Sequence, residues 1–420
     1  MSLSQEKNSS SAANTGKNQF RIIVGSYEHN ILCVSLDLSL SEPLFSAIFH
    51  FQAHALSVKC LASCKRYLVS GSNDEHIRIY DLQKRKELGT LLSHQGSITA
   101  LKFSGETVNF ETKESDPRSK GKWLLSASED KTISIWRVKD WEKFGVLKGH
   151  TARINDIDIH PSNRIAISVS DDHTIRLWNL MTIKKAGILK LRKYNQNGQF
   201  VRWCGENSEF FVVALTNLIL FYKTSDAKVF HEIELSAGKT IMHLEVVKIE
   251  GVEYVVVALN DGNVSFFNTN FLKEETAQKQ LDEEELDDIN DFQGTKADFS
   301  LLGHSNRVKD FKIYENPFGL YLVTIGSDGR IVVWNLHSRD QIAVYDCGER
   351  LNCLSLISED VEKFDSMKKR TLTEADLEGE QSEVEADPEE LKKIMLGGKN
   401  KRKKKGSMGK KAKKVTVELE

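Results

Sequence analysis

The stretch AISVSDDHTIRLWNL, residues 166–180, decides the fold. An apolar run leads into an Asp-Asp-His turn, and a second run then alternates polar and apolar residues up to Trp178. Turn residues between two such runs are typical of a β-hairpin. Three other stretches repeat the pattern: LVSGSNDEHIRIYDL (68–82), LLSASEDKTISIWRV (124–138) and LVTIGSDGRIVVWNL (322–336). The chain is therefore built from repeated β-hairpin units.

Four polar or aromatic positions recur at fixed places in each copy. An aromatic residue lies six positions after an aspartate, a serine or threonine lies four positions before that aspartate, and a histidine precedes the hairpin. The four sets are His54, Ser70, Asp74 and Tyr80; His94, Ser126, Asp130 and Trp136; His150, Ser168, Asp172 and Trp178; and His304, Thr324, Asp328 and Trp334.

This combination resembles the WD40 family, whose repeats of about 40 to 45 residues carry Gly-His and Trp-Asp signatures. The resemblance covers roughly residues 20–357. It implies an all-β, seven-bladed propeller in which the four side chains form a buried hydrogen-bond network within a blade. A Ser-His-Asp catalytic triad would occur once, whereas these sets recur beside a strand-borne aromatic. We therefore expect structural tetrads, with no catalytic residue, metal site or cofactor.

Three further hairpins lack the complete set, at residues 21–38, 203–224 and 252–270. They place Val24, Val257 and Phe267 at tetrad positions, so we expect these blades to depend on apolar packing. A single strand at 350–357 follows the last complete blade. Pairing it with the N-terminal hairpin would close the ring and remove two exposed sheet edges.

The composition indicates a non-membrane protein from a reducing compartment. Six cysteines are scattered through expected strands without a Cys-x-x-Cys pair, as buried small side chains would be. Residues 1–19 are polar and have no hydrophobic signal core. The longest apolar stretch, 210–222, is interrupted by Thr216 and Asn217 and is too short to span a bilayer. We expect a soluble, monomeric propeller with a disordered N-terminal tail at 1–19.

Two insertions break the repeat: a polar one at 104–122 and an acidic one at 271–298. The first would connect the first and second strands of blade three, and the second would connect the third and fourth strands of blade six. Because strands in a blade alternate in direction, we expect both insertions and both termini on one face. The acidic insertion is either a solvated loop or a mimic that competes with nucleic acid for a basic partner.

The C-terminal segment, 358–420, is charged and is expected to be disordered. Residues 359–390 contain thirteen acidic and four basic residues, whereas residues 391–414 contain twelve basic and no acidic residues. Between them, Asp387 and Pro388 favour the start of a short helix at 388–396. The helix would carry an apolar stripe of Leu391, Ile394 and Met395. A helix this short is not stable alone in water, so it would either fold on a partner or remain disordered.

The run 399–414 is densely basic and contains no aromatic residue. It fits nuclear import, contact with RNA phosphates, or a solubilising tail, but not base stacking. Its basic residues are Lys399, Lys401, Arg402, Lys403, Lys404, Lys405, Lys410, Lys411, Lys413 and Lys414.

The whole-chain pattern resembles the PAK-interacting WD-repeat family. FRIIVGSYEHNILCVSL, HPSNRIAISVSDDHTIRLWNLMTIKKA, LRKYNQNGQFVRW and the acidic-then-basic ending carry this resemblance. Fungal members act in assembly of the large (60S) ribosomal subunit, so the resemblance implies a nuclear and nucleolar scaffold that aids pre-rRNA maturation by docking assembly proteins on precursor particles. An animal member is a negative regulator of PAK kinases, which leaves a kinase adaptor as the alternative. An enzyme is a third class, and it would need an unpaired polar cluster in the central channel.

Overall fold

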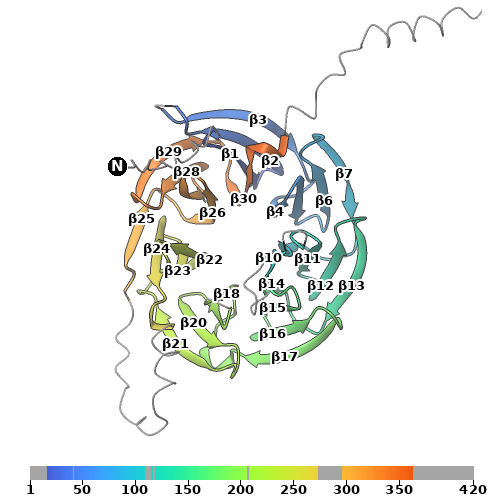
Figure 1. The fold of residues 1–420 in the computed structure, drawn as a ribbon. Helices are drawn as coiled ribbons and strands as arrows, with labels where there is room; N and C mark the ends of the chain where they lie inside the picture. The colour runs from blue at the N-terminus through green and yellow to red at the C-terminus, as the bar shows by residue number, and fades with distance from the viewer. Residues whose placement is uncertain are drawn as a thin grey trace, which may run out of the picture. The chain divides into compact units, whose positions relative to one another are not determined.

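The computed structural model describes residues 17–40, 42–108, 115–116, 119–205, 208–272 and 296–362. The chain divides into two units, Met1–Lys363 and Phe364–Glu420, and every described residue belongs to the first. Within the described ranges, seven four-stranded antiparallel sheets surround a central channel (Figure 1). The structure confirms the seven-bladed all-β propeller that the repeat pattern predicts.

Each blade runs from an innermost strand at the channel to an outermost strand at the rim. From inside to outside, blade one consists of β30 (Leu351–Ser358), β1 (Gln19–Ser26), β2 (Asn30–Asp37) and β3 (Leu44–Gln52), and blade two of β4 (Val58–Cys64), β5 (Tyr67–Ser72), β6 (Ile77–Asp81) and β7 (Lys86–Leu91). In the same order, blade three consists of β8 (Ile98–Phe103), β11 (Trp123–Ser128), β12 (Thr132–Arg137) and β13 (Glu142–Lys148), blade four of β14 (Ile154–Ile159), β15 (Ile165–Ser170), β16 (Thr174–Asn179) and β17 (Lys184–Lys190), and blade five of β18 (Phe200–Cys204), β19 (Phe210–Ala214), β20 (Leu218–Lys223) and β21 (Val229–Glu234). Blade six consists of β22 (Ile241–Ile249), β23 (Val252–Leu259), β24 (Asn263–Asn268) and β25 (Phe299–Leu302), and blade seven of β26 (Val308–Asn316), β27 (Gly319–Gly326), β28 (Arg330–Asn335) and β29 (Asp340–Asp346). The remaining elements are a two-stranded ribbon of β9 (Thr107–Val108) and β10 (Ser115–Asp116), and the 3₁₀ turns η1 (Arg192–Tyr194) and η2 (Glu359–Glu362).

The apolar core lies between the blades. The innermost strand of each blade contacts that of the next, and β26 contacts β30, which contacts β4. Large side chains such as Trp178, Phe211 and Phe311 are fully buried between neighbouring sheets. Because each sheet buries both of its faces, no blade can keep its core without its two neighbours.

Ring closure joins the two ends of the propeller in blade one. Strand β30 pairs antiparallel with β1, from Phe20 opposite Ser358 to Gly25 opposite Cys353. Just beyond the sheet, the Arg21 guanidinium lies 2.6 Å from a Glu359 carboxylate oxygen of η2. This closure, predicted from the lone C-terminal strand, is confirmed, and it pairs two edges that would otherwise be exposed.

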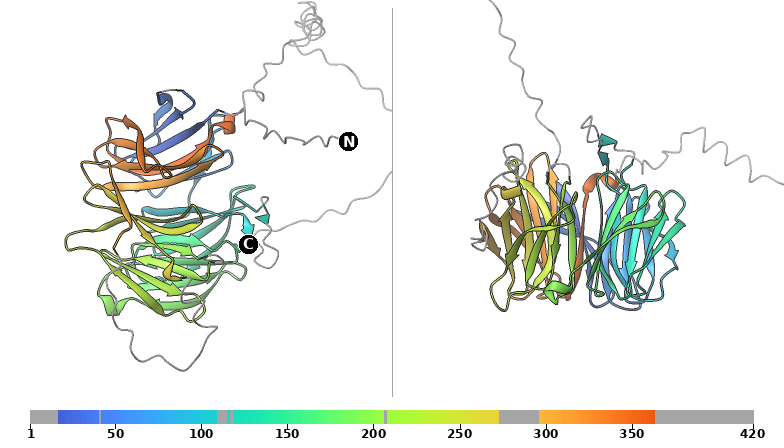
Figure 2. Two further views of the ribbon diagram at one scale, coloured as in Figure 1. Left: turned by 60° about the vertical axis from the view of Figure 1, so that its left-hand side comes forward. Right: turned by 90° about the horizontal axis from the view of Figure 1, so that it is seen from below.

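The two faces of the ring carry different connections. The tight-turn face holds the turns between the second and third strands and the links from one blade to the next. The insertion face holds the turns between the first and second strands and between the third and fourth. There, the Asn163 side chain donates to the Gly105 carbonyl at 2.9 Å, at the start of the blade-three insertion. The β9–β10 ribbon and η2 lie on the same side of the ring (Figure 2).

The second insertion joins β24 to β25, and both of its described ends lie at the insertion face. Near its start, Thr269 hydrogen-bonds to Glu253 beside the β22–β23 turn. The positions predicted for the acidic insertion (mainly 273–295), the N-terminal tail up to residue 16, the short helix and the Lys-rich run lie outside the described residues.

Candidate functional site

The tetrad of blade four is a continuous chain of hydrogen bonds. The Trp178 indole N–H donates to Ser168 Oγ at 2.8 Å, and Ser168 Oγ lies 2.8 Å from His150 Nε2. His150 Nδ1 lies 2.9 Å from Asp172 Oδ2. An ionised Asp172 accepts the Nδ1 proton, so Nε2 accepts the Ser168 hydroxyl proton and each group in the chain has a partner.

Blade three repeats this geometry. His94 Nδ1 lies 2.8 Å from Asp130 Oδ2, and His94 Nε2 lies 2.8 Å from Ser126 Oγ. Trp136 donates to the same Ser126 oxygen at 2.9 Å. Thr132 adds a hydroxyl donor to Asp130 at 2.7 Å, a contact that the spacing analysis did not include.

Blades seven and two depart from this geometry at the aromatic position. His304 contacts Thr324 at 2.9 Å and Asp328 at 3.1 Å, while Trp334 reaches Thr324 Oγ1 at 3.4 Å. The structure thus brings together the residues that the sequence pattern selected in this blade.

In blade two, His54 contacts Ser70 at 2.7 Å and Asp74 at 2.9 Å. A tyrosine replaces the tryptophan, and among the described residues its buried hydroxyl makes no hydrogen bond, so Tyr80 lies outside the hydrogen-bond chain predicted for this blade. Burial raises the pKa of Tyr80 to about 12.

Burial decides what the tetrads do. Ser168 and Ser126 are fully buried, and the His150 side chain is also inaccessible to solvent. Burial lowers the pKa of His150, and the contact with Asp172 offsets that effect only in part. A neutral imidazole with both nitrogens bonded fixes one arrangement of the blade. The tetrads therefore act as internal struts of the blades.

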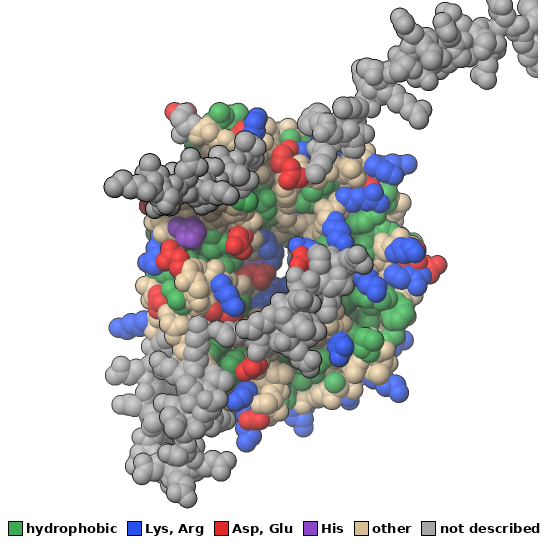
Figure 3. Space-filling model, viewed as in Figure 1, with side chains coloured by type: hydrophobic (Ala, Val, Ile, Leu, Met, Phe, Trp, Pro, Cys, Tyr) green, Lys and Arg blue, Asp and Glu red, His purple; other side chains and the backbone are tan. Residues whose placement is uncertain are grey.

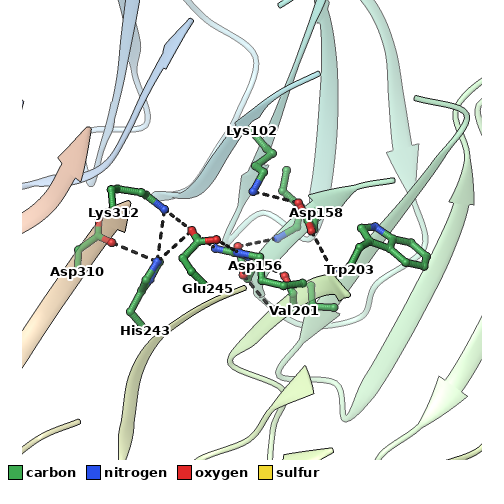
Figure 4. A network of polar contacts seen from close by, with 11 residues as sticks. Lys102, Asp156, Asp158, Val201, Trp203, His243, Glu245, Asp310 and Lys312 are labelled. Carbon is green, nitrogen blue, oxygen red and sulfur yellow. Dashed lines mark hydrogen bonds and ion pairs between the residues drawn. The ribbon is translucent and has the colours of Figure 1, made fainter. Parts of the chain in front are cut away.

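A second polar cluster lies in the channel itself, which we call the channel network (Figure 4). It consists of Lys102, Asp156, Asp158, Arg202, His243, Glu245, Asp310 and Lys312. These side chains come from the innermost strands β8, β14, β18, β22 and β26, so the network joins five consecutive blades. Viewed onto the insertion face, basic and acidic side chains line the central opening (Figure 3).

Arg202 is the hub of the channel network. It contacts Asp156 of blade four, and its Nε lies 2.9 Å from Glu245 of blade six. Burial alone would raise the pKa of Glu245, but Arg202 and Lys312 outweigh burial and hold it well below its usual range. The charges of these buried groups are thus matched by their partners across the channel.

Carboxylates of the channel network also bind backbone amides of the next blade. Asp156 accepts from the Val201 N–H at 3.1 Å, and Asp158 accepts from the Trp203 N–H at 3.1 Å. In blade seven, Asp310 accepts from the Leu354 N–H of β30 at 2.8 Å, across the closure of the ring. These bonds fix the spacing between neighbouring innermost strands.

The channel network revises one expectation about the incomplete blades. Blades five and six were expected to depend on apolar packing alone, yet they supply Arg202, His243 and Glu245. Their apolar packing is real, since Val257 and Phe267 are buried where a tetrad would stand. Sequence reasoning missed the network because its members recur in no motif. The available signal was charge at alternate positions of an otherwise apolar innermost strand.

Metal binding and cysteine chemistry are the other possibilities for the described part of the chain. There, no group of three or more His, Cys, Asp or Glu side chains could hold a metal ion. The six cysteines are free thiols, and burial raises the pKa of Cys60 and Cys353. Across the described ranges, no helix is both long and apolar enough to cross a membrane.

Comparison with known proteins places the chain in a family. The sequence model of the WD40 family, described as WD domain, G-beta repeat, matches residues 45–81, 116–137, 141–179 and 296–335. Each range contains the hairpin of one tetrad blade. Protein MAK11 of Saccharomyces cerevisiae is 60% identical over 416 residues, which cover 96% of this chain and 99% of that protein. The chain belongs to the MAK11 family of WD-repeat proteins.

Relatives of lower identity occur in animals. The p21-activated protein kinase-interacting protein 1-like protein of Xenopus laevis is 27% identical over 341 residues, or 80% of this chain and 81% of that protein. The p21-activated protein kinase-interacting protein 1 of Homo sapiens is 29% identical over 318 residues, or 74% of this chain and 68% of that protein. The resemblance to the PAK-interacting WD-repeat family is therefore confirmed, and the chain is a WD-repeat scaffold.

Proposed function

We propose that this MAK11-family chain is a non-catalytic scaffold in ribosome biogenesis, acting in assembly of the large (60S) subunit and maturation of pre-rRNA. The observation that carries the proposal is the 60% identity to Protein MAK11 across almost the full length of both chains. The family resemblance already found in the sequence implies this role for fungal members. Similarity of this extent covers the surfaces of the propeller as well as its core.

The structure supports a binding role over a chemical one. The recurring Ser-His-Asp sets are buried struts, and the described channel network pairs its charges instead of presenting a free nucleophile or base. The ring offers two faces and a rim, which allows several proteins to bind at once. Partners on this proposal are ribosome-assembly proteins and precursors of the large subunit.

We further propose a nuclear and nucleolar location, with the Lys-rich run 399–414 as the import signal. The same run would contact rRNA phosphates without reading sequence, because it carries charge and no aromatic side chain. Such contact would weaken steeply with added salt.

A kinase adaptor is the second candidate, and the printed names of the animal relatives favour it. On that reading the propeller would bind a PAK-type kinase and restrain its signalling. The Lys-rich run favours the nucleolar role, since an adaptor in the cytoplasm has no need of it.

Sedimentation of the tagged protein on sucrose gradients separates the two candidates. Gradients run at low and high salt, with sequencing of the RNA in each fraction, should show the protein in particles that contain large-subunit pre-rRNA. A protein that migrates only as a free monomer without pre-rRNA would contradict the ribosomal role. Co-migration with a kinase in small complexes would support the adaptor.

A further inference from the structure

The mouth of the channel on the tight-turn face is built from β-bulges. In six of the seven described blades the innermost strand has one residue without a partner on the adjacent strand. A bulge bends the strand and redirects the side chain of the extra residue. The six residues all line one cavity at the channel mouth, and they are Lys59, Thr99, Asn155, Met242, Lys309 and Asn352.

Positive charge gathers in one sector of this mouth. Lys309 of blade seven and Lys59 of blade two lie on either side of Asn352 in blade one. Arg307 and Arg350 immediately precede β26 and β30 in the same sector. We call these four side chains the basic sector. Partial burial, together with Arg307, Arg350 and Lys59, lowers the pKa of Lys309 to about 8.

The basic sector is not balanced by ion pairs among the described residues. Lys59, Arg307 and Lys309 make no ion pair there, in contrast to the lysines of the channel network. Asp310, the buried carboxylate that follows Lys309 in the sequence, is already engaged by the Leu354 N–H and by His243. Like charges held together without counterions destabilise the folded protein, and a bound anion would reverse that effect.

We propose that the basic sector binds the carboxylates of an acidic segment in a protein partner. Two exposed apolar side chains border it on the same face: Tyr27, 56% exposed, and Leu56, 47% exposed. The Arg350 guanidinium lies 5.6 Å from the centre of the Tyr27 ring. A polypeptide can supply carboxylates for the lysines and apolar side chains for Tyr27 and Leu56 in one segment.

The surroundings of the basic sector disfavour a nucleic-acid strand. Glu28, Glu75 and Glu129 stand on neighbouring turns of the same face. These carboxylates interrupt the positive charge on either side of the sector, so a long phosphate backbone has no continuous basic path across this face. A short cluster of carboxylates fits within the sector. Binding of an acidic segment at the basic sector does not depend on the cellular role proposed above.

The test uses the full chain and a fluorescein-labelled peptide containing six consecutive glutamates, measured by anisotropy at physiological salt. Replacing both bulge lysines (Lys59→Glu with Lys309→Glu) should weaken binding by about tenfold or more, the size expected for two charge-assisted contacts. The control, Lys184→Glu with Lys190→Glu on the exposed rim strand β17, makes the same charge change. It should alter affinity by less than about twofold, because the Debye length of about 8 Å screens distant charges.

Equal losses in the two double variants would overturn the proposal, since binding would then follow net charge alone. If Lys59→Glu with Lys309→Glu lowered the affinity for a hexauridylate probe and left peptide binding unchanged, the proposal would also be overturned and the site would be a nucleic-acid site. The Lys309→Met variant gives an independent readout if charge reversal prevents folding. It removes the repulsion between Lys309 and its basic neighbours, so it should raise the thermal midpoint of unfolding by roughly 1–3 °C. It should still lower the affinity for the peptide, because one cation is lost. An unchanged or lower midpoint would contradict the like-charge strain on which the proposal depends.

Discussion

The Ser168 hydroxyl should be one of the most costly single atoms to remove from the propeller. It accepts from the Trp178 indole at 2.8 Å and bonds to His150 Nε2 at 2.8 Å. Ser168→Ala deletes both bonds without adding bulk. Because His150 and Trp178 remain buried, water cannot replace the lost partner.

The expected cost follows from the two groups left unpaired. Each buried donor or acceptor without a partner costs about 1–3 kcal/mol, so Ser168→Ala should lower the free energy of unfolding by about 2–6 kcal/mol. Ser265 of blade six is a control, since it is also a buried serine, on β24, one strand further from the channel than Ser168 on β15. Its hydroxyl bonds only to Ser300, which is exposed and can bind water instead. Ser265→Ala should therefore cost less than about 1 kcal/mol.

Urea unfolding followed by tryptophan fluorescence measures both variants, with hydrogen exchange of the β15 and β16 amides as a local probe. The exchange of these amides should accelerate in Ser168→Ala and stay unchanged in Ser265→Ala. If the two variants differ by less than about 0.5 kcal/mol, the tetrad is not a strut and the reasoning fails.

Three other predictions follow from the buried charges and from the tail. Three tetrad histidines, His54, His150 and His304, have pKa values lowered from 6.5, so on acidification the unfolded chain binds protons before the folded chain does. The free energy of unfolding should therefore fall as the pH is lowered from about 7 to about 5. An unchanged urea midpoint across this range would contradict the prediction. Arg202→Met should cost about 3–5 kcal/mol in urea unfolding, because it leaves the buried Asp156 without its cation and Glu245 with Lys312 alone. Arg153→Met, at an ion pair with Glu129 in which both side chains are exposed, should cost less than about 1 kcal/mol. Deleting 399–414 should reduce nuclear retention of a fluorescent fusion, and normal nucleolar signal after the deletion would exclude that segment as the import signal.

The repeat made the fold predictable from sequence. Each complete hairpin carries its aspartate, serine or threonine, and aromatic at fixed separations, so position alone showed which side chains should meet. The single strand at 350–357 predicted ring closure in the same way, because this strand and the N-terminal hairpin each had an unpaired edge and could pair with each other. Local spacing was sufficient for features that lie within one blade.

The channel network shows where such reasoning ends. Arg202 reaches Asp156 and Glu245, which are 46 and 43 residues away on different blades. No periodicity marks these positions, and a charged residue on an innermost strand looks the same in the sequence whether it faces solvent or a partner across the channel. The bulges that direct Lys59 and Lys309 to the channel mouth are equally invisible, because they depend on the pairing register of each blade.

Selective depletion of the protein in growing cells tests the central claim most directly. If it is a scaffold for large-subunit assembly, loss of the protein should lower the ratio of free 60S to 40S subunits. Early precursors of the large-subunit rRNAs should accumulate, while maturation of the small-subunit rRNA continues. An unchanged subunit ratio with normal pre-rRNA processing, together with altered activity of a PAK-type kinase, would contradict the account and favour the adaptor.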